Sequence, residues 1–217
     1  PTTLQGLLMA RLDQLGPAIH GNGAIFLYGP PGTGKSSVAE RVIRAFDDTV
    51  LIPYCIEVDG QIVSVFDPTL HDEVEERPPG IDKRWVLCQR PAVVAGGELH
   101  AGMLDLQLDR DTGVYMAPLQ LKANNGVLVI DDFGRQAMSP DALLNRWIVP
   151  LDRRVDYLSL SYGVKFEIPF EVKVVFSTNI ERRPWATRPS SAGSRTRSTS
   201  RRSPTTRSTR CSGSRRS

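Results

Sequence analysis

The sequence has few of the residues from which metal and redox centres are built. Its 217 residues include only three cysteines and three histidines. The cysteines are odd in number and widely spaced, which predicts neither a disulfide framework nor a cysteine zinc site. The histidines are scattered along the chain, so no cluster that could hold a transition metal is expected.

Long apolar runs are missing as well. No stretch of about 18 apolar residues occurs, so no membrane-spanning helix is predicted. The chain starts at Pro1 with a segment of helical pattern rather than a charged and then apolar leader, and no signal peptide is predicted. With 40% hydrophobic residues the chain can bury a core, and we expect a cytoplasmic protein.

Lysine and large aliphatic residues are absent from the C-terminal part. Residues 181–217 contain eleven arginines, no lysine and one acid, Glu181, whereas residues 1–180 are acidic. A segment without apolar surface cannot offset the entropy of ordering, so a disordered basic tail is predicted. It is either an arm for nucleic acid or the product of a frameshift in GC-rich codons. We favour the frameshift, because the rest of the chain does use lysine.

What the chain does have is a set of apolar runs of strand length, each followed by polar residues. Helical spacing of apolar residues predicts helices between them, and two further segments have the pattern of hairpins. The expected strands are residues 24–28, 126–130 and 172–176, the expected helices are 3–15, 35–46 and 140–149, and the expected hairpins are 50–66 and 155–168. This alternation predicts a three-layer α/β fold with a central parallel sheet. For residues 68–110 the sequence predicts little beyond two possible strands, residues 85–88 and 92–95.

Residues 29–36, which read GPPGTGKS, fit the P-loop pattern at every required position. Glycines let successive backbone N–H groups face one phosphate group, and the following helix adds its positive N-terminus. Lys35 would reach the β- and γ-phosphates, and the Ser36 hydroxyl would join the shell of a Mg²⁺ ion. The residues expected to bind ATP are Gly29, Pro30, Pro31, Gly32, Thr33, Gly34, Lys35, Ser36 and Ser37.

Polar residues also end the two later strands. Asp131 and Asp132 follow residues 127–130, and Asn179 ends the third strand. Asp131 is expected to bind Mg²⁺ together with Ser36. Asp132 is expected to orient and deprotonate the attacking water, and Asn179 to contact the γ-phosphate or that water. Parallel strands bring their carboxyl ends to one edge of a sheet, so these residues are expected to form one catalytic site with Lys35.

These residues resemble the AAA+ ATPase superfamily, with residues 29–36 as Walker A, residues 127–132 as Walker B and Asn179 as sensor 1. The hairpin before the sensor strand, and residues 117–124, look like the pre-sensor-1 hairpin group, which includes MoxR-type proteins. The resemblance covers residues 4–180 and implies a P-loop NTPase core that uses ATP and Mg²⁺. It also implies a homo-oligomeric ring, often of six subunits, that remodels a macromolecular client. The acidic body favours a protein client over nucleic acid.

The sequence departs from the family in two ways. The second Walker B acid is usually Glu, but Asp132 is one methylene shorter. Residues 181–217 contain no recognisable fifth strand, arginine finger or helical lid, and Arg153 and Arg154 have the pattern of ordinary surface residues. Two alternatives therefore stay open, a nucleotide-dependent switch or scaffold with little turnover and a small-molecule P-loop kinase. A GTPase is not expected, because the Asn-Lys-x-Asp guanine reader is absent.

Overall fold

The computed structural model describes residues 23–179 except for residues 31, 45, 47 and 76–78. The predicted helix over residues 3–15, the P-loop residue Pro31 and the predicted tail over residues 181–217 lie outside the described residues. Among the described residues, no helix has the length and apolar character needed to cross a membrane.

Four parallel strands form the central sheet, in the order β1 (Ile25–Tyr28), β12 (Lys173–Thr178), β9 (Val127–Ile130) and β6 (Ala92–Ala95). Three of them are the predicted strands, and the α/β fold class is confirmed. Within the described residues β1 pairs only with β12, so most of its side chains are half-buried rather than buried.

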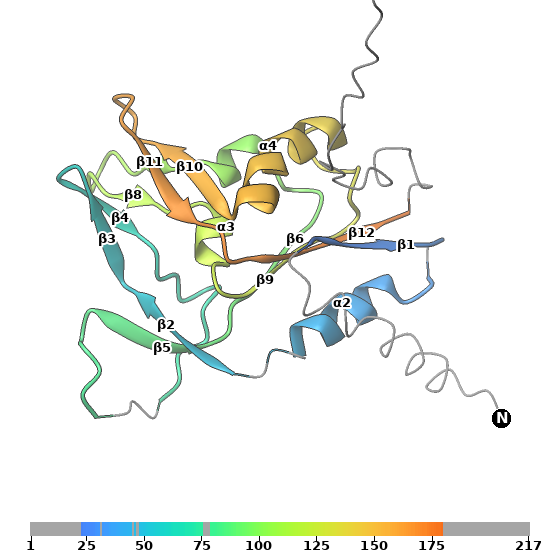
Figure 1. The fold of residues 1–217 in the computed structure, drawn as a ribbon, viewed down its shortest axis with the longest axis horizontal. Helices are drawn as coiled ribbons and strands as arrows, with labels where there is room; N and C mark the ends of the chain where they lie inside the picture. The colour runs from blue at the N-terminus through green and yellow to red at the C-terminus, as the bar shows by residue number, and fades with distance from the viewer. Residues whose placement is uncertain (1–22, 31, 45, 47, 76–78, 180–217) are drawn as a thin grey trace, which may run out of the picture. The chain divides into compact units, whose positions relative to one another are not determined.

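Helices cover both faces of this sheet (Figure 1). Helix α2 (Lys35–Arg44) lies on one face, where its Ala39 and Val42 pack in a cluster with the strand residues Ile25, Val129 and Val175. Helix α4 (Pro140–Arg153) lies on the other face. Alternate side chains of a strand point to opposite faces, so each strand contributes to both layers.

Aromatic rings fill the layer beneath α4. Phe176 of β12 lies 4.5 Å from the ring of Phe26, 5.0 Å from Phe133 and 5.8 Å from Trp147 of α4, measured between ring centroids. Trp147, Phe133 and Phe176 are fully buried. Large aromatic side chains contribute much of the buried apolar area of a core. This packing fixes the position of Phe133, and with it the turn that follows β9.

Helix α4 begins and ends with identifiable caps. The Ser139 hydroxyl accepts a hydrogen bond from the Ala142 N–H at 3.2 Å and so pairs one of the N–H groups that the first turn leaves unbonded. The helix continues four residues past the predicted end at residue 149. It passes through the buried Pro150 and closes at Arg154, whose φ of 59° is left-handed.

The remaining strands form three small units around a second core, and their pairs are antiparallel except for the parallel pair of Gln61–Ser64 with Tyr115–Met116. They are β2 (Thr49–Pro53) with β5 (Trp85–Gln89), β10 (Val155–Ser159) with β11 (Lys165–Pro169), and a four-stranded sheet of β3 (Cys55–Val58), β4 (Gln61–Ser64), β8 (Tyr115–Met116) and β7 (Gln107–Leu108). The predicted hairpin over residues 155–168 is confirmed, and that over residues 50–66 is confirmed for residues 55–64, because residues 49–53 pair with β5 instead. Asp59 and Gly60 turn the first hairpin with φ of 50° and 74°. Short helical segments, η1 (Ala101–Leu104) and α3 (Leu119–Lys122), flank these units.

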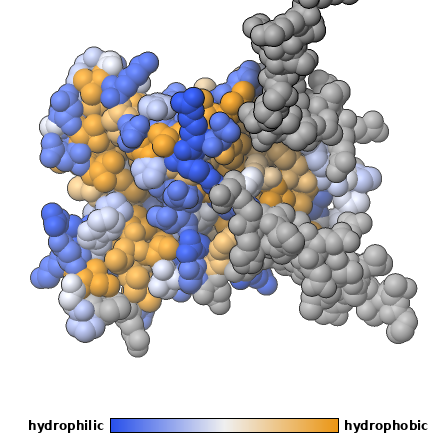
Figure 2. Space-filling model, in the orientation of Figure 1, coloured by the Kyte–Doolittle hydropathy of each residue, from blue (hydrophilic) through white to orange (hydrophobic). Residues whose placement is uncertain are grey.

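Apolar side chains remain exposed on this hairpin region. Figure 2 shows apolar surface interrupted by polar surface on the side where Figure 1 draws the hairpins. The exposed residues of this region are Leu51, Tyr54, Ile62, Trp85, Leu108, Met116, Tyr157 and Tyr162. The hairpins are joined at their tips, where the Tyr162 hydroxyl donates to Asp59 Oδ2 at 2.9 Å.

Candidate active site

The loop between β1 and α2 is bent by two glycines and closed by one threonine. Gly32 and Gly34 both have φ of 78°, in the left-handed region that glycine enters without steric cost. The Thr33 hydroxyl donates to the Pro30 carbonyl at 2.8 Å. A Cβ atom on Gly29 would lie 2.8 Å from Thr33 Oγ1, so this close approach needs glycine.

Lys35, the first residue of α2, folds its side chain back over this loop. Its Nζ donates to the carbonyls of Gly29 and Pro30, both at 2.9 Å. The ammonium group is therefore held within the curve of the loop by neutral oxygens, which an anionic ligand could replace. Ser37 is exposed, and the side chain of Ser36 lies outside the described part of the structure.

The acid pair sits in a sharp turn at the end of β9. The Asp131 N–H still bonds to the Ala95 carbonyl of β6 at 2.9 Å, so Asp131 keeps the sheet register. Asp132 then adopts a left-handed φ of 48°, and its N–H donates to Asp131 Oδ1 at 3.0 Å. Short polar residues tolerate this conformation better than others. The turn therefore directs the two carboxylates differently although they are adjacent in sequence.

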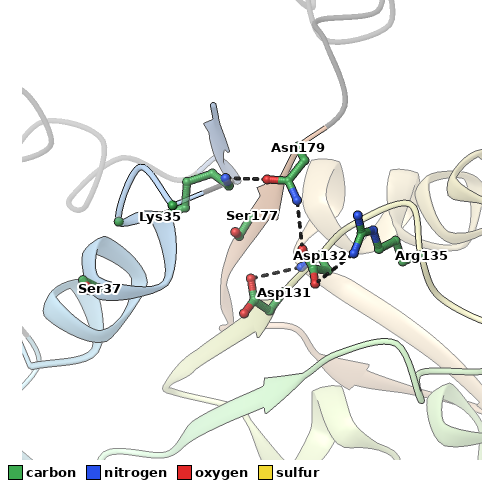
Figure 3. Close-up of a pocket in the computed structure, with 9 residues that line it drawn as sticks. Lys35, Ser37, Asp131, Asp132, Arg135, Ser177 and Asn179 are labelled. Atoms are coloured by element: carbon green, nitrogen blue, oxygen red, sulfur yellow. Dashed lines mark hydrogen bonds and ion pairs between the residues drawn. The ribbon is translucent and has the colours of Figure 1, made fainter. Parts of the chain in front are cut away.

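Strand β12 anchors the same turn from its other side. The Phe133 N–H donates to the Ser177 carbonyl at 2.7 Å, and the Thr178 hydroxyl donates to the Phe133 carbonyl at 2.8 Å. One residue further, Asn179 reaches both the loop and the acid turn. Its Oδ1 accepts from Lys35 Nζ at 2.5 Å, and its Nδ2 donates to Asp132 Oδ1 at 3.3 Å (Figure 3).

These groups surround one cleft of about 460 Å³ at the carboxyl edge of the sheet. It is lined by Gly32, Gly34, Lys35, Ser37, Asp131, Asp132, Arg135, Ser177 and Asn179. The structure therefore brings together the lysine, both acids and the asparagine that the sequence singled out. Gly29, Pro30 and Thr33 support the loop but do not line the cleft. The binding and catalytic roles of all these residues stay predictions.

The sequence reasoning did not single out Arg135, a second cation of the cleft. Its guanidinium lies 3.9 Å from Asp132 Oδ2, and both side chains are largely in solvent, at 69% and 49% exposure. A pair this exposed contributes little to stability. The only indication in the sequence that Arg135 lines the cleft is its position three residues after Asp132. The course of the turn between them was not predicted.

Gln136 was also missed, although it contacts the turn more extensively than any predicted residue. Its Nε2 donates to the carbonyls of Asp131 at 2.8 Å and Asp132 at 3.2 Å. Its Oε1 accepts from the Gly134 N–H at 2.7 Å. No pattern of residue types points to a glutamine at this position.

Arg154, for which the sequence predicted an ordinary surface position, does not line the cleft. Arg154 closes α4 and donates to the Val172 carbonyl at 3.4 Å, and its own carbonyl accepts from Phe170. Tyr162 is at the hairpin tip. The structure groups no three His, Cys, Asp or Glu side chains as a metal site within the described ranges.

Comparison with known proteins gives structural matches only. No family model matches the sequence, and no curated protein matches it. A structure of the complex between subunits BchI and BchD of magnesium chelatase is similar with a TM-score of 0.50 and 18% identity, over 82% of this chain and 53% of that one. NtrX from Brucella abortus is similar with a TM-score of 0.48 and 15% identity, over 82% of this chain and 31% of that one.

NtrX in complex with ADP is similar with a TM-score of 0.45 and 15% identity, over 83% of this chain and 30% of that one. Both NtrX likenesses have TM-scores below 0.5. The chain spans about half the length of the magnesium chelatase protein and less than a third of NtrX. At these identities the likeness concerns the fold alone. The described part of the chain thus has an α/β fold with a central four-stranded parallel sheet, similar to that of the magnesium chelatase subunits.

Proposed function

We propose that this chain carries the nucleotide-binding core of an AAA+ type ATPase. The observation that supports this is the meeting of Lys35, Asp131, Asp132 and Asn179 in one cleft, although Lys35 and Asn179 are 144 residues apart in sequence. A phosphate-binding loop, a pair of carboxylates and a polar strand end at one sheet edge are the parts that phosphoryl transfer to water needs.

In this proposal Lys35 leaves the carbonyls of Gly29 and Pro30 and pairs with the β- and γ-phosphates. Asp132 accepts a proton from water as the water oxygen attacks the γ-phosphorus and the bond to the ADP oxygen breaks. Asn179, which bridges Lys35 and Asp132, would contact the γ-phosphate or the attacking water. Positioning and electrostatic stabilisation account for nearly all catalysis in reactions of this kind.

The donor set fits a magnesium–nucleotide ligand. The cleft offers a carboxylate on Asp131, an ammonium on Lys35 and a loop whose glycines at 32 and 34 bend the backbone around it. Oxygen ligands suit Mg²⁺, which keeps several waters and nucleotide oxygens in its shell. Ser36 and Asp131 would hold the ion, which when bound neutralises developing charge on the phosphates.

Steady-state ATP hydrolysis with Mg²⁺ tests the proposal, on the unmodified chain and on Lys35→Ala and Asp132→Asn. The expected result is turnover that rises more than in proportion to protein concentration and is lost in both variants. Lys83→Ala is the matched control, because Lys83 is exposed and outside the cleft. Turnover that survives Lys35→Ala would contradict the assignment of this cleft.

A second candidate is a switch that binds ATP and turns it over slowly. The short side chain of Asp132, together with its half-exposed position and its pairing with Arg135, favours this candidate. It predicts tight Mg-ATP binding by isothermal calorimetry that is lost in Lys35→Ala, with negligible phosphate release in the unmodified chain. The two candidates share the nucleotide site and differ only in turnover.

We also propose that the chain works as a homo-oligomer acting on a protein client, with six subunits as the expected ring. The exposed apolar residues of the hairpin region support a protein partner, and the similar magnesium chelatase structure is a complex of two kinds of subunit. Sedimentation with and without Mg-ATP is the test. A monomer under both conditions, at concentrations where turnover is measured, would contradict the ring.

A further inference from the structure

One side chain, that of Gln136, forms four hydrogen bonds with the backbone around the acid pair. Its Nε2 donates to the carbonyls of Asp131 at 2.8 Å, Asp132 at 3.2 Å and Gly96 at 3.4 Å. Its Oε1 accepts from the Gly134 N–H at 2.7 Å. An amide nitrogen has two hydrogens, so the three carbonyls share them, and the amide uses both of its donors and one acceptor site in this turn.

The turn needs such a support because its backbone is unusual. Asp132 has φ of 48° and Gly134 has φ of 104°. Left-handed conformation is unfavourable for a residue with a Cβ, and it persists only where the surroundings hold it. Phe133, between the two, is tied to β12 through Ser177 and Thr178. Gln136 supplies the restraint on the other side, towards Gly96 at the end of β6.

We propose that Gln136 is a positioning residue that holds the Asp132 carboxylate in the orientation needed for catalysis. The inference rests on the proposed ATP hydrolysis in this cleft. Gln136 is not among the residues that line the cleft, so it acts through the backbone of the acids and not on the nucleotide. Loss of its amide lets the turn leave its left-handed conformation and moves Asp132 away from Asn179.

The chemistry of the contacts makes glutamine specific at this position. Methionine has a similar length but no hydrogen-bonding amide, so it removes all four bonds while filling the space. Glutamate retains an acceptor for the Gly134 N–H, but in its ionised form it places a carboxylate oxygen against three carbonyl oxygens. Protonation of that glutamate restores one donor, because a carboxylic acid carries an O–H.

The experiment measures kcat and the dissociation constant of Mg-ATP separately for Gln136→Met and Gln136→Glu. We expect kcat to fall roughly 10- to 100-fold in Gln136→Met, the size of effect seen when a residue that orients a ligand group is lost. The dissociation constant should change less than about twofold, because Lys35 and the loop are untouched. In Gln136→Glu, the ratio of its kcat to that of the unmodified chain should rise as the pH is lowered.

Gln107→Met is the matched control, since the Gln107 amide also donates to a backbone carbonyl, that of Gly102 at 2.8 Å, outside the cleft. Its kcat should equal that of the unmodified chain.

Unchanged kcat in Gln136→Met overturns the inference, and so does a fall in kcat matched by equal loss of nucleotide affinity and of thermal stability. If Gln136→Met does not fold, the pH dependence of Gln136→Glu is the test. A ratio of its kcat to that of the unmodified chain that does not change with pH overturns the inference. No turnover in the unmodified chain overturns the proposed function and, with it, this inference.

Discussion

Lys35 Nζ and Asn179 Oδ1 lie 2.5 Å apart, which ties the first helix of the central fold to the end of its last described strand. Asn179 in turn donates to Asp132 at 3.3 Å. The Asn179 amide thus bridges the Lys35 ammonium and the Asp132 carboxylate. An asparagine amide can do this because its oxygen accepts from a cation while its nitrogen donates to a carboxylate.

This bridge predicts separate effects on binding and turnover. In Asn179→Asp the new carboxylate can still pair with Lys35 but repels Asp132, and in Asn179→Ala both contacts are lost. We expect kcat to fall about 100-fold in each variant, in line with the loss of one oriented group in a catalytic site. Mg-ATP affinity should fall more in Asn179→Asp, because added negative charge opposes the γ-phosphate. Asn145→Ala, on the exposed side of α4, is the control, and equal affinity in the two Asn179 variants would contradict the prediction.

The left-handed backbone at Asp132 gives a prediction about stability. Asn tolerates this conformation about as well as Asp, whereas Ala does not. Asp132→Asn should therefore retain the free energy of unfolding while losing at least about 100-fold in kcat. Asp132→Ala should lose about 1 kcal/mol of stability in addition. Urea denaturation of the two variants measures this difference, and equal stabilities would show that the φ of 48° costs nothing in the alanine variant.

The sequence was informative wherever apolar strands end in polar residues. The positions of Lys35, Asp131, Asp132 and Asn179 followed from strand runs and from the rule that parallel strands end at one edge. Strand β9 is wholly apolar and buried β12 contains a continuous apolar run at residues 174–176, and such runs have few alternatives to a sheet interior. The convergence of these four site residues in one cleft could therefore be predicted from the sequence alone.

The sequence predicted helices and hairpins between these strands, but not which further strand joins the central sheet. Residues 92–95 were a possible strand in the weakly patterned stretch 68–110, and they form β6, but its place in the central sheet beside β9 was not predicted. Its place depends on pairing with a strand about 35 residues later, which local propensity does not encode. Arg135 and Gln136 were missed for the same reason, because their contacts depend on left-handed turns at Asp132 and Gly134.

Asp67 gives a prediction about pH and stability. Burial alone would raise its pKa, but hydrogen bonds from Lys122, at 2.8 Å, and from Thr69 outweigh this and bring the pKa to about 2. A carboxyl whose pKa is lowered by folding stabilises the protein above its unfolded pKa of about 4. That stability is lost as the pH falls through about 2.

The expected result is a fall of up to about 2 kcal/mol in the free energy of unfolding between pH 5 and pH 2 that is absent in Asp67→Asn. Urea denaturation at a series of pH values measures it. Asp82→Asn is the control, because the Asp82–Arg84 pair is exposed and should leave the pH dependence unchanged. A pH profile of Asp67→Asn that matches the unmodified chain would contradict the assignment.

The last prediction concerns the polar contact that joins α4 to the hairpin of β10 and β11. Arg146 donates to both oxygens of Asp156, at 2.5 and 2.9 Å, and Asp156 is almost fully buried. Gln120 donates to the same carboxylate at 3.0 Å. Removing the arginine leaves a buried charge without its cation. We therefore expect Arg146→Met to lose about 3–5 kcal/mol of stability.

The double variant Arg146→Met, Asp156→Asn should recover a large part of this loss, because no charge is then left buried. Arg153→Met, on an exposed position of the same helix, is the control and should change stability by less than about 0.5 kcal/mol. Denaturant titrations of the single and double variants close the cycle. Additive losses would mean that the Asp156 charge is not balanced by Arg146, and that Gln120 and water account for its burial instead.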